Sequence, residues 1–438
     1  MSGLRLFGYC PRPVARRLAG VPIALAAAAL LILSSRLLPE RCVYNEMGRL
    51  RAETTGDLSL GPAPRGDQLA RFTAACGEAP PADTSIHRHP YLQEVTARSA
   101  AVVWTAEPLP APLVKYWAPG TPAAARTVAA AVDRSAPVPR GVQYVAALDG
   151  LAAGQVVCYQ LLDGRRPLAG PFGFASAPAA GSAAPIRIAA IGDMGWRSSD
   201  QDAVRDQLGQ VEVDLVLMAG DIGYPSGRLR DYEENVFPVY GPLMARAPFV
   251  PASGNHDYMT GDGGPFRQVF VLPENGGRDG RERWYSTDWG DLHIVVLDTE
   301  KVGEAQAKWL EADLAAAAGA RWTIALFHKP PFSSGELGRD LATRETLVPI
   351  LTRHRVALVI TGHEHDYERR EPVDGVHYLI TGGGGRGTRQ VSELGEGSAF
   401  AEQVAHFVYL VVTDDEIRLW AIDATGQTFD TARITRSR

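Results

Sequence analysis

Five short polar segments, each directly after an apolar run, contain the residues whose types could do chemistry. They supply two aspartates, one asparagine, three histidines and one tyrosine: Asp193, Asp221, Tyr224, Asn255, His328, His363 and His365. Oxygen donors mixed with imidazoles favour a pair of first-row transition-metal ions over calcium or magnesium alone. Two such ions would lower the pKa of a shared water and neutralise phosphoryl oxygens as charge develops. A phenolate ligand such as Tyr224 would suit trivalent iron, because deprotonating a phenol needs a strong Lewis acid.

The combination of these segments is more informative than any one of them. On its own, Asp193 would indicate a turn or a helix cap, and His328 a satisfied core histidine. All the segments occur in one chain and each follows an apolar run. Together they predict a single shared metal site.

Apolar strands that end in polar loops, interleaved with helical stretches, predict an α/β domain after residue 185. We expect strands at 186–191, 215–219, 249–251, 292–297, 322–327 and 356–361, and helices at 201–211, 304–317 and 339–354. Ligands of open α/β sheets collect outside the carboxyl ends of the strands, so the polar segments can converge on one crevice. A glycine before most of the ligand residues is expected to let the chain turn sharply there.

The region upstream has a different pattern, with short apolar or alternating runs separated by Pro and Gly. Strands are expected at 91–96, 100–105, 113–117, 143–148 and 155–162, which together predict a small β-sandwich. The Ala/Pro/Gly/Ser stretch 177–185 is typical of a linker. At the other end of the chain, 407–434 alternates again as strands.

The N-terminus and the overall charge limit where the protein acts and what it binds. Four arginines precede the apolar run 21–33, and no acidic residue occurs before Glu40. This layout predicts a signal peptide or signal anchor over 1–38, hence an exported protein, with a membrane tether through 18–35 left open beside cleavage. The formal net charge of −6 and the lack of a Lys/Arg block argue against nucleic-acid binding.

Three cysteines, Cys42, Cys76 and Cys158, follow the N-terminal segment. Cys42 and Cys76 bracket a polar stretch and could form a disulfide in an oxidising compartment. Cys158 lies in an apolar strand pattern and is expected to be a buried thiol.

The polar segments resemble the motifs of the calcineurin-like metallophosphoesterases. Gly-Asp-x-Gly, Gly-Asp-x-x-Tyr, Gly-Asn-His-Asp, a lone His and Gly-His-x-His are all present, and Tyr224 narrows the resemblance to purple acid phosphatase-like members. The resemblance implies an α/β fold, a four-layer αββα sandwich over 186–438. It also implies a fibronectin type III-like, all-β domain over 87–178, which begins near Pro90-Tyr91-Leu92-Gln93. Residues 39–86 are then a linker.

The resemblance also implies a role for each matching residue. Asp193, Tyr224 and His365 would bind a ferric ion, Asn255, His328 and His363 a divalent zinc, iron or manganese ion, and Asp221 would bridge the two. His256, with Asn255, would contact the substrate phosphate and protonate the leaving oxygen, and Asp257 would orient His256. The implied reaction is hydrolysis of phosphate monoesters by a metal-bound hydroxide.

One departure from the family pattern keeps a second reaction open. Family members commonly carry further histidines shortly after the lone metal histidine, but 329–337 contains none. A metal-dependent phosphodiesterase is therefore the alternative, because the missing side chains leave room for a second ester group. A third reading is an exported binding module without catalysis, which the complete ligand set argues against.

Two further patterns lie near the candidate ligands. The glycine run 382–385 lacks the Lys-Ser/Thr of a phosphate-binding loop, so we expect a turn near the metal cleft. Tyr367, Glu368 and Arg369 follow His365 directly and are expected to support it.

Overall fold

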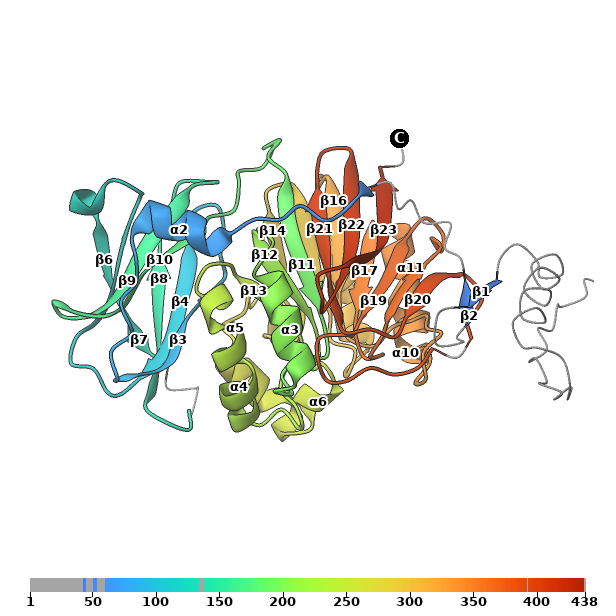
Figure 1. Ribbon diagram of the computed structural model, residues 1–438, viewed down its shortest axis with the longest axis horizontal. Coiled ribbons are helices and arrows are strands. Elements are labelled where there is room, and N and C mark those ends of the chain that lie inside the picture. The colour runs from blue at the N-terminus through green and yellow to red at the C-terminus, as the bar shows by residue number, and fades with distance from the viewer. Residues whose placement is uncertain (1–41, 45–49, 53–59, 134–137, 392, 437–438) are drawn as a thin grey trace, which may run out of the picture. The chain divides into compact units, whose positions relative to one another are not determined.

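The computed structural model describes residues 42–44, 50–52, 60–133, 138–391 and 393–436 (Figure 1). The chain divides into two units, Met1–Glu53 and Thr54–Arg438. In the first, β1 (Cys42–Tyr44) pairs antiparallel with β2 (Leu50–Ala52). The predicted signal segment 1–38 lies outside the described residues. Within the described ranges, no helix has both the length and the apolar character needed to cross a membrane.

The second unit begins with two antiparallel sheets that form a β-sandwich. Their strand orders are β3-β4-β8-β7 and β10-β9-β5-β6. The strands are β3 (Ile86–Gln93), β4 (Ala100–Ala106), β5 (Pro112–Trp117), β6 (Arg126–Ala129), β7 (Ala131–Val132), β8 (Val142–Leu148), β9 (Val156–Asp163) and β10 (Arg166–Ala175), with a 3-10 turn η2 (Pro122–Ala124) before β6. The strands expected from alternation are all present, as β3, β4, β5, β8 and β9.

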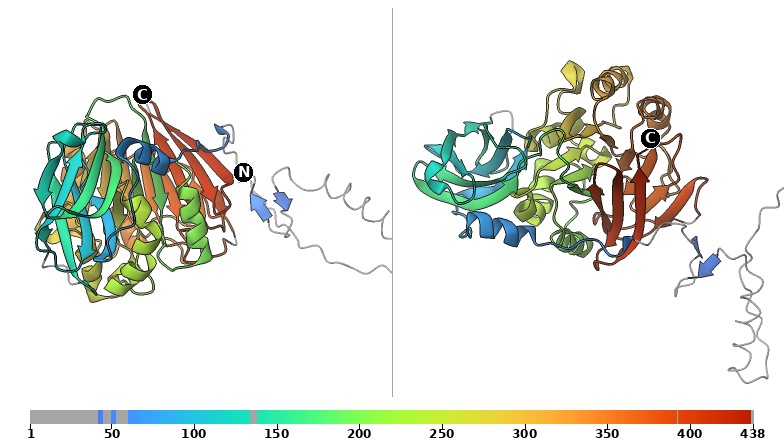
Figure 2. Two further views of the ribbon diagram at one scale, coloured as in Figure 1. Left: turned by 60° about the vertical axis from the view of Figure 1, so that its left-hand side comes forward. Right: turned by 90° about the horizontal axis from the view of Figure 1, so that it is seen from above.

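Helix α2 (Gln68–Cys76) lies within the segment expected to be a linker. The Asp67 side chain caps it by accepting a hydrogen bond of 2.8 Å from the Ala70 amide. The helix lies along β9 and β10 of the sandwich (Figure 2).

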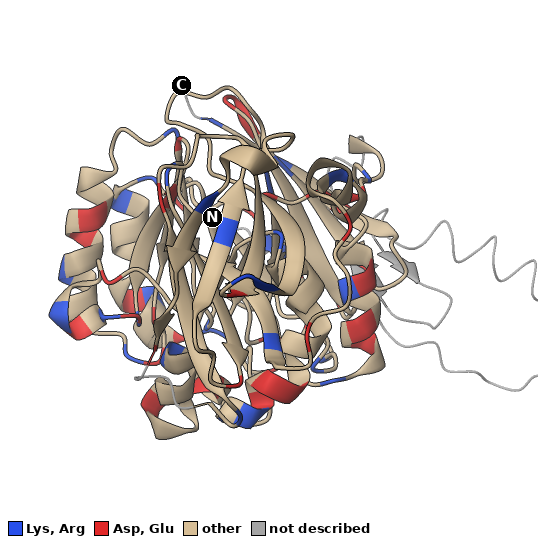
Figure 3. Cartoon of the chain, turned by 90° about the vertical axis from the view of Figure 1, so that its left-hand side faces the viewer, with Lys and Arg blue, Asp and Glu red and all other residues tan. Residues whose placement is uncertain are grey.

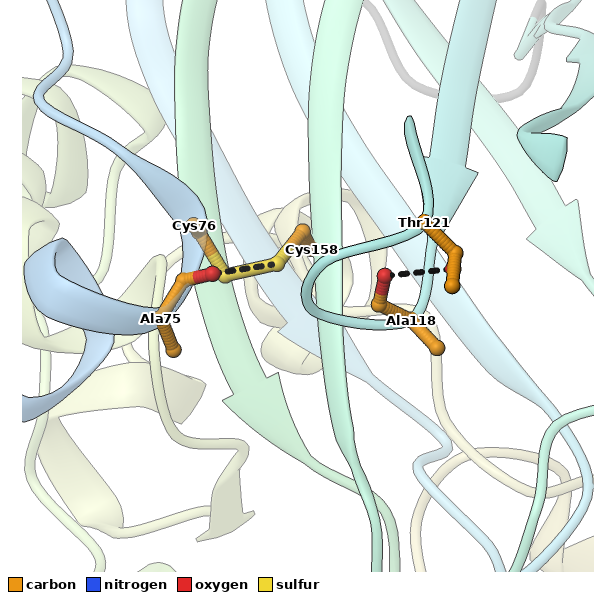
Figure 4. Close-up of a disulfide and its surroundings, with 5 residues drawn as sticks. All are labelled: Ala75, Cys76, Ala118, Thr121 and Cys158. Carbon is orange, nitrogen blue, oxygen red and sulfur yellow. Dashed lines mark hydrogen bonds between the residues drawn. A yellow bond between two sulfur atoms is a disulfide. The ribbon is translucent and has the colours of Figure 1, made fainter. Parts of the chain in front are cut away.

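A disulfide joins Cys76, the last residue of α2, to Cys158 in β9 (Figure 4). The pairing of Cys42 with Cys76, which the sequence left open, does not form, and the expectation that Cys158 is a free thiol is wrong, although Cys158 is buried. The physical reason is the packing of α2 on β9, which brings together two cysteines that are 82 residues apart in sequence. Spacing along the chain contains no sign of that contact.

A six-stranded mixed sheet follows, in the order β13-β12-β11-β21-β22-β23. Its strands are β11 (Ile186–Ile191), β12 (Leu215–Ala219), β13 (Phe249–Ala252), β21 (His406–Val412), β22 (Glu416–Asp423) and β23 (Thr428–Thr435). The first three are parallel, whereas β21 pairs antiparallel with β11, and β22 and β23 continue the sheet through further antiparallel pairs. The carboxyl ends of β11, β12 and β13 therefore share one edge.

A seven-stranded sheet has the order β14-β15-β16-β17-β19-β18-β20. Its strands are β14 (Tyr285–Trp289), β15 (Leu292–Val296), β16 (Trp322–Leu326), β17 (Leu358–Thr361), β18 (Tyr367–Arg370), β19 (His377–Thr381) and β20 (Ser398–Glu402). Strands β15, β16, β17 and β19 are parallel, so their carboxyl ends also share an edge.

Helices cover the outer faces of these two sheets (Figure 1). They are α3 (Ser199–Leu208), α4 (Leu229–Asn235), α5 (Phe237–Met244), α6 (Asn255–Tyr258), α7 (Gly264–Val269), α8 (Gly277–Gly280), α9 (Glu304–Ala316), α10 (Leu341–Thr346) and α11 (Val348–Arg353), with a 3-10 turn η3 (Gly261–Gly263). The single helix expected at 339–354 is split into α10 and α11. Pro349, in the first turn of α11, has no N–H to continue the helical hydrogen bonds of α10.

Alternating side chains connect the layers. In β15, Ile294 and Val296 belong to the core between the two sheets, whereas Val295 packs with Leu310 and Leu314 of α9 in a second cluster. This period-2 alternation is what a strand buried on both faces requires. The layer order is helix, sheet, sheet, helix, and with the β-sandwich upstream it confirms the predicted fold class.

Buried polar contacts join the sandwich to the α/β part. Arg88 is fully buried, forms an ion pair with Glu233 of α4, and donates a 2.8 Å hydrogen bond to Gln143 of β8. The Tyr159 hydroxyl donates to the Ala245 carbonyl at 2.8 Å. Burying a guanidinium costs free energy unless the group is paired. These bonds therefore favour one arrangement of the sandwich against the α/β part.

Candidate metal centre

The candidate ligands lie at the carboxyl ends of strands from both sheets. Asp193, Asp221 and Asn255 follow β11, β12 and β13 of the six-stranded sheet. His328 follows β16, and His363 and His365 follow β17 of the seven-stranded sheet. The site is therefore formed where the corresponding edges of two packed sheets meet.

One group of donor atoms surrounds the phenol of Tyr224. Its hydroxyl lies 3.0 Å from Asp193 Oδ1, 3.0 Å from Asp221 Oδ2 and 3.3 Å from His365 Nε2. His365 Nε2 is also 3.4 Å from Asp193 Oδ1. All of these side chains are buried.

A second group surrounds His328. Its Nε2 atom lies 3.2 Å from Asn255 Oδ1, 3.2 Å from His363 Nδ1 and 3.4 Å from Asp221 Oδ2. Asp221 Oδ2 is thus the atom shared by both groups. The structure brings together all the residues expected to be ligands.

Main-chain hydrogen bonds orient these donors. The His363 amide donates to Asp193 Oδ2 at 2.8 Å, and the His256 amide donates to Asp221 Oδ1 at 2.7 Å. Each carboxylate therefore keeps its other oxygen directed toward the centre. His328 Nδ1 is 2.9 Å from the Ala219 carbonyl, which can only accept, so Nδ1 carries a proton and Nε2 is the nitrogen that would face a metal ion.

The backbone is strained at three of these residues. Asp193, Asp221 and His363 have φ of 56°, 51° and 73°, in the left-handed region that non-glycine residues seldom adopt. Each such residue costs of order 1–3 kcal/mol and persists only where its surroundings enforce it. Three of the nine non-glycine residues with positive φ in the described part of the chain are thus candidate ligands.

The glycines before the ligands are needed more for close approach than for turning. A Cβ on Gly254 would lie 2.2 Å from Asp221 Oδ1, although its φ of −120° is ordinary. Gly220 combines both needs, because its φ is +83° and a Cβ there would lie 2.5 Å from His328 Nδ1. The expectation of a sharp turn at every such glycine is wrong for Gly254.

The electrostatics of the site favour a cation. Burial lowers the pKa of His328, but Asp221 and Asp193 outweigh burial and raise that pKa to about 10. Burial and the neighbouring charge of His328 lower the pKa of His363 to about 3. Burial and then the two carboxylates raise the pKa of the Tyr224 phenol well above its ordinary value. The carboxylates thus favour the protonated, positively charged form of His328. Bound metal ions would supply that positive charge instead.

The donor set fits two metal ions. Asp193, Asp221 and His328 each offer a ligand atom, and these atoms lie within 4.8 Å of one another. The four remaining donors extend this cluster on its two sides, Tyr224 and His365 beside Asp193 and Asn255 and His363 beside His328, with Asp221 between. Imidazole, carboxylate, amide and phenol donors suit first-row transition metals.

His256 lies beside the Tyr224 group. Its ring is 4.4 Å from the Tyr224 ring, and its side chain is 23% exposed. Its Nδ1 atom is 2.7 Å from the Pro225 carbonyl and must therefore donate. Nε2 lies 3.9 Å from Asp221 Oδ2 and is the nitrogen left for a substrate.

Asp257 makes hydrogen bonds that differ from the expected one. Its carboxylate accepts from the amides of Ile222, Gly223 and Gly254 and from the Tyr232 hydroxyl at 2.8 Å. Burial, and then the charge of Asp221, raise the pKa of this carboxyl to about 6. Asp257 thus holds together the loops after β12 and β13, and the hydrogen bond of the His256 ring goes to Pro225 instead.

The residues expected to support His365 lie elsewhere. Tyr367 and Arg369 both bind Asp430, and Glu368 binds Ser334 and Arg370. Because side chains alternate along β18, Tyr367 and Arg369 lie on one face of the strand and Glu368 on the other.

Sequence reasoning missed the residue that does support the ligand histidines, and two neighbours of Tyr224. The Arg389 amide donates to the His365 carbonyl at 2.9 Å, and its guanidinium donates to the His363 carbonyl at 2.7 Å. Trp196 and Arg386 contact the Tyr224 ring. The glycine run before Arg386 was the available signal, and it does form a turn beside the centre, as expected.

Comparison with known proteins agrees with the geometry. Residues 186–367 match the family model of the calcineurin-like phosphoesterases. The chain is 30% identical over 152 residues to an uncharacterized protein of Mycobacterium tuberculosis, a match that covers 29% of each chain. It is 28% identical over 228 residues to purple acid phosphatase 1 of Ipomoea batatas, covering 48% of each. A nucleotide pyrophosphatase/phosphodiesterase of Hordeum vulgare is 27% identical over 279 residues, covering 51% of this chain and 75% of the relative.

The chain matches less than half the length of the first two of these relatives. Among solved structures, a purple acid phosphatase from yellow lupin seeds superimposes with a TM-score of 0.69 at 20% identity, covering 80% of this chain and 74% of that one. The likeness to that structure shows a shared fold. With the family model over residues 186–367 and the curated relatives, it supports a purple acid phosphatase-like metallophosphoesterase.

Proposed function

We propose that this protein hydrolyses phosphate monoesters at a centre of two metal ions. The observation that carries the proposal is the sharing of Asp221 Oδ2 between two groups of donors, 3.0 Å from the Tyr224 hydroxyl and 3.4 Å from His328 Nε2. A carboxylate placed in this way suits a bridge between two cations. Paired cations a few ångströms apart are a recurrent device for displacement at phosphorus.

Each group would hold one ion. Asp193, Tyr224 and His365 would bind Fe(III). Burial and the two carboxylates raise the pKa of the Tyr224 phenol, so a strong Lewis acid is needed to ionise it. Asn255, His328 and His363 would bind divalent Zn, Fe or Mn. When bound, the two ions supply a water of lowered pKa and neutralise the phosphoryl oxygens.

The chain's own residues would position the substrate and move a proton. Asn255 and His256 stand beside each other at the start of α6, where the amide and the imidazole can both reach the phosphate. Because His256 Nδ1 donates to Pro225, Nε2 is the atom that would deliver a proton to the leaving oxygen. The hydrogen bond to Pro225 holds the ring in place for that transfer.

The phosphate must be held by this local set. In Figure 3, Lys and Arg are interspersed with Asp and Glu over the helices and loops, in keeping with the formal net charge of −6. Attraction of polyanions by a broad positive surface is therefore not the basis of the proposal.

Hydrolysis of diesters is the second candidate. The segment after His328, from Lys329 to Leu337, has no histidine to crowd a second ester group, and one relative is named as a nucleotide pyrophosphatase/phosphodiesterase. The two reactions differ in whether the site accepts a substituent on a second phosphoryl oxygen.

A comparison of 4-nitrophenyl phosphate with bis(4-nitrophenyl) phosphate on the metal-loaded protein separates the candidates. We expect kcat/KM to favour the monoester by at least about tenfold, a difference of roughly 1.4 kcal/mol. His328→Ala should abolish turnover of both. His354→Ala is the matched control, because His354 pairs with Glu311 on α9 and should leave turnover unchanged.

The reverse preference would assign the protein to the diesterases. If neither ester is turned over with both metals bound, hydrolysis is rejected. The remaining candidate is then an exported binding module without catalysis.

We also propose that the protein is exported. The disulfide between Cys76 and Cys158 supports this, because such bonds persist mainly in oxidising compartments. Mass spectrometry of the chain recovered outside the cytoplasm should show either loss of residues 1–38 or a retained membrane anchor. Recovery only from the cytoplasm, with Cys76 and Cys158 reduced, would contradict export.

A further inference from the structure

The glycine run after β19 places an arginine beside the centre. The Gly384 amide donates to the Gly192 carbonyl at 2.9 Å, and the Arg386 amide donates to the Asp193 carbonyl at 3.0 Å. Gly385 has a φ of +120°, and a Cβ there would lie 2.5 Å from Gln201 Cα. The run of glycines is therefore what lets this loop lie flat against the loop that carries Asp193.

Arg386 is stacked on an exposed tryptophan. Its guanidinium carbon lies 3.9 Å from the centre of the Trp196 ring and 5.3 Å from that of Tyr224. Trp196 meets Tyr224 edge to face at 6.0 Å and is 39% exposed. Gln201 holds the tryptophan in place by accepting its amide hydrogen at 3.0 Å.

The Nε atom of this half-buried guanidinium is buried without a hydrogen-bond partner. Among the described residues, no carboxylate forms an ion pair with Arg386. Arg88, the fully buried arginine of the sandwich, is by contrast paired with Glu233. A buried N–H group without an acceptor is unfavourable, so the site would gain from an anion that supplies that acceptor.

We propose that Trp196 and Arg386 form a subsite for the alcohol part of the substrate and select phosphate esters whose alcohol is aromatic and carries a second negative charge. The proposal rests on the proposed hydrolysis at the dimetal centre. The exposed part of the Trp196 ring offers a flat surface for an aromatic group, and Arg386 offers hydrogen bonds to a carboxylate or a further phosphoryl group. Their contact with Tyr224 places both beside the ester bond.

Two matched phosphonates test binding without catalysis, because the C–P bond is not hydrolysed. They are 4-carboxybenzylphosphonate and 4-carbamoylbenzylphosphonate, which differ in charge but hardly in shape. By calorimetry on the metal-loaded protein at fixed salt, we expect the carboxylate to bind about tenfold more tightly, as for one charge-assisted hydrogen bond. In Arg386→Gln the two Kd values should become equal.

Two further variants separate the subsite from general effects. Arg230→Gln removes a 61% exposed charge on α4 and should keep the wild-type ratio of Kd values. Trp196→Leu keeps Arg386 but removes its stacking partner, so the ratio should fall. Metal content is measured for each variant. If Arg386→Gln loses its metals, the ratio of Kd values in Trp196→Leu is the test of the subsite.

Equal Kd values in the wild type, or a ratio that is unchanged in both Arg386→Gln and Trp196→Leu, would overturn the subsite. Turnover of 4-carboxyphenyl and 4-carbamoylphenyl phosphates distinguishes this from failure of the proposed function. Charge-selective binding without turnover of either ester would retain the subsite and reject hydrolysis. Turnover of both esters without selectivity would retain hydrolysis and reject the subsite.

Discussion

Tyr224 is the residue on which the proposed assignment of one metal as Fe(III) depends. Its hydroxyl contacts two carboxylates and an imidazole, and its ring lies between His256 and Trp196. The other candidate ligands would serve zinc, manganese or iron alike. A phenol whose pKa is raised by burial and by two carboxylates ionises only against a strongly charged cation.

Tyr224→Phe should therefore remove the visible phenolate-to-iron absorption band of the iron-loaded protein and weaken iron binding by about 10- to 100-fold. Absorption spectra and iron titration measure both effects. Tyr378→Phe is the matched control, because the Tyr378 hydroxyl is buried without a hydrogen-bond partner in the described part of the chain. A colourless wild-type protein that is active with two manganese or zinc ions would reject the iron assignment.

At this scale the convergence of the candidate ligands could be predicted from the sequence, and the neighbours of these residues could not. Asp193 and Asn255 each stand in a local motif, so the residue types and their spacing were sufficient. Arg386 lies 193 positions after Asp193, yet the Arg386 amide bonds to the Asp193 carbonyl. Such contacts arise from how two loops pack, which the order of residues does not record.

At the scale of elements, the loop after β12 sets the position of His328, which comes from the other sheet. Gly220 allows the contact because it has no side chain and adopts a φ of +83°. The two sheets thus meet at a point where a single added methyl group would not fit.

Gly220→Ala should displace His328 and lower the affinity for the divalent metal by about 10- to 100-fold. Metal titration followed by calorimetry measures the change. Gly319→Ala, after α9, is the control, since a Cβ there would have no atom within 4 Å. Equal metal affinity in the two variants would show that the close approach does not position His328.

His293 links three elements on the opposite side of the seven-stranded sheet from the core between the sheets. Its Nδ1 is 2.7 Å from Asp288 of β14, and its Nε2 is 2.9 Å from Asp313 of α9. Burial lowers the pKa of His293, but the two carboxylates outweigh burial and raise it to about 9.

Because the folded pKa lies above the unfolded value of about 6.5, the protonated histidine stabilises the fold below pH 6.5, and this stabilisation is lost as the pH rises through about 9. We expect His293→Gln to lower the free energy of unfolding by about 2 kcal/mol at pH 6, allowing for the exposure of Asp288, and by much less at pH 10. Urea unfolding at both pH values measures the difference. A loss of equal size at pH 6 and pH 10 would contradict the titration.

Regular elements were predicted well and irregular ones poorly. The expected bounds of β11 and β12 match the structure residue for residue. Strand β10 was missed because its Gly170-Pro171 step and two register shifts interrupt the alternation that marks a strand. Helix α2 was missed because it is short and lies in a segment rich in Pro and Gly.

At the scale of the whole molecule, the order of the domains could be predicted, but the covalent bond between α2 and the sandwich could not. Cys76 and Cys158 close a span of 82 residues, and pairing cysteines requires knowing which elements pack together. The predicted bounds 87–178 and 186–438 remain predictions.

The dimetal centre depends on the fold as a whole, since one sheet supplies Asp193, Asp221 and Asn255 and the other supplies the three histidines. The most direct test is the number of metal ions per chain, measured by elemental analysis together with hydrolysis of 4-nitrophenyl phosphate. We predict two ions per chain, loss of both ions and of turnover on chelation, and recovery of turnover only when both ions are restored. Undiminished turnover with one ion or none per chain would contradict the centre described here.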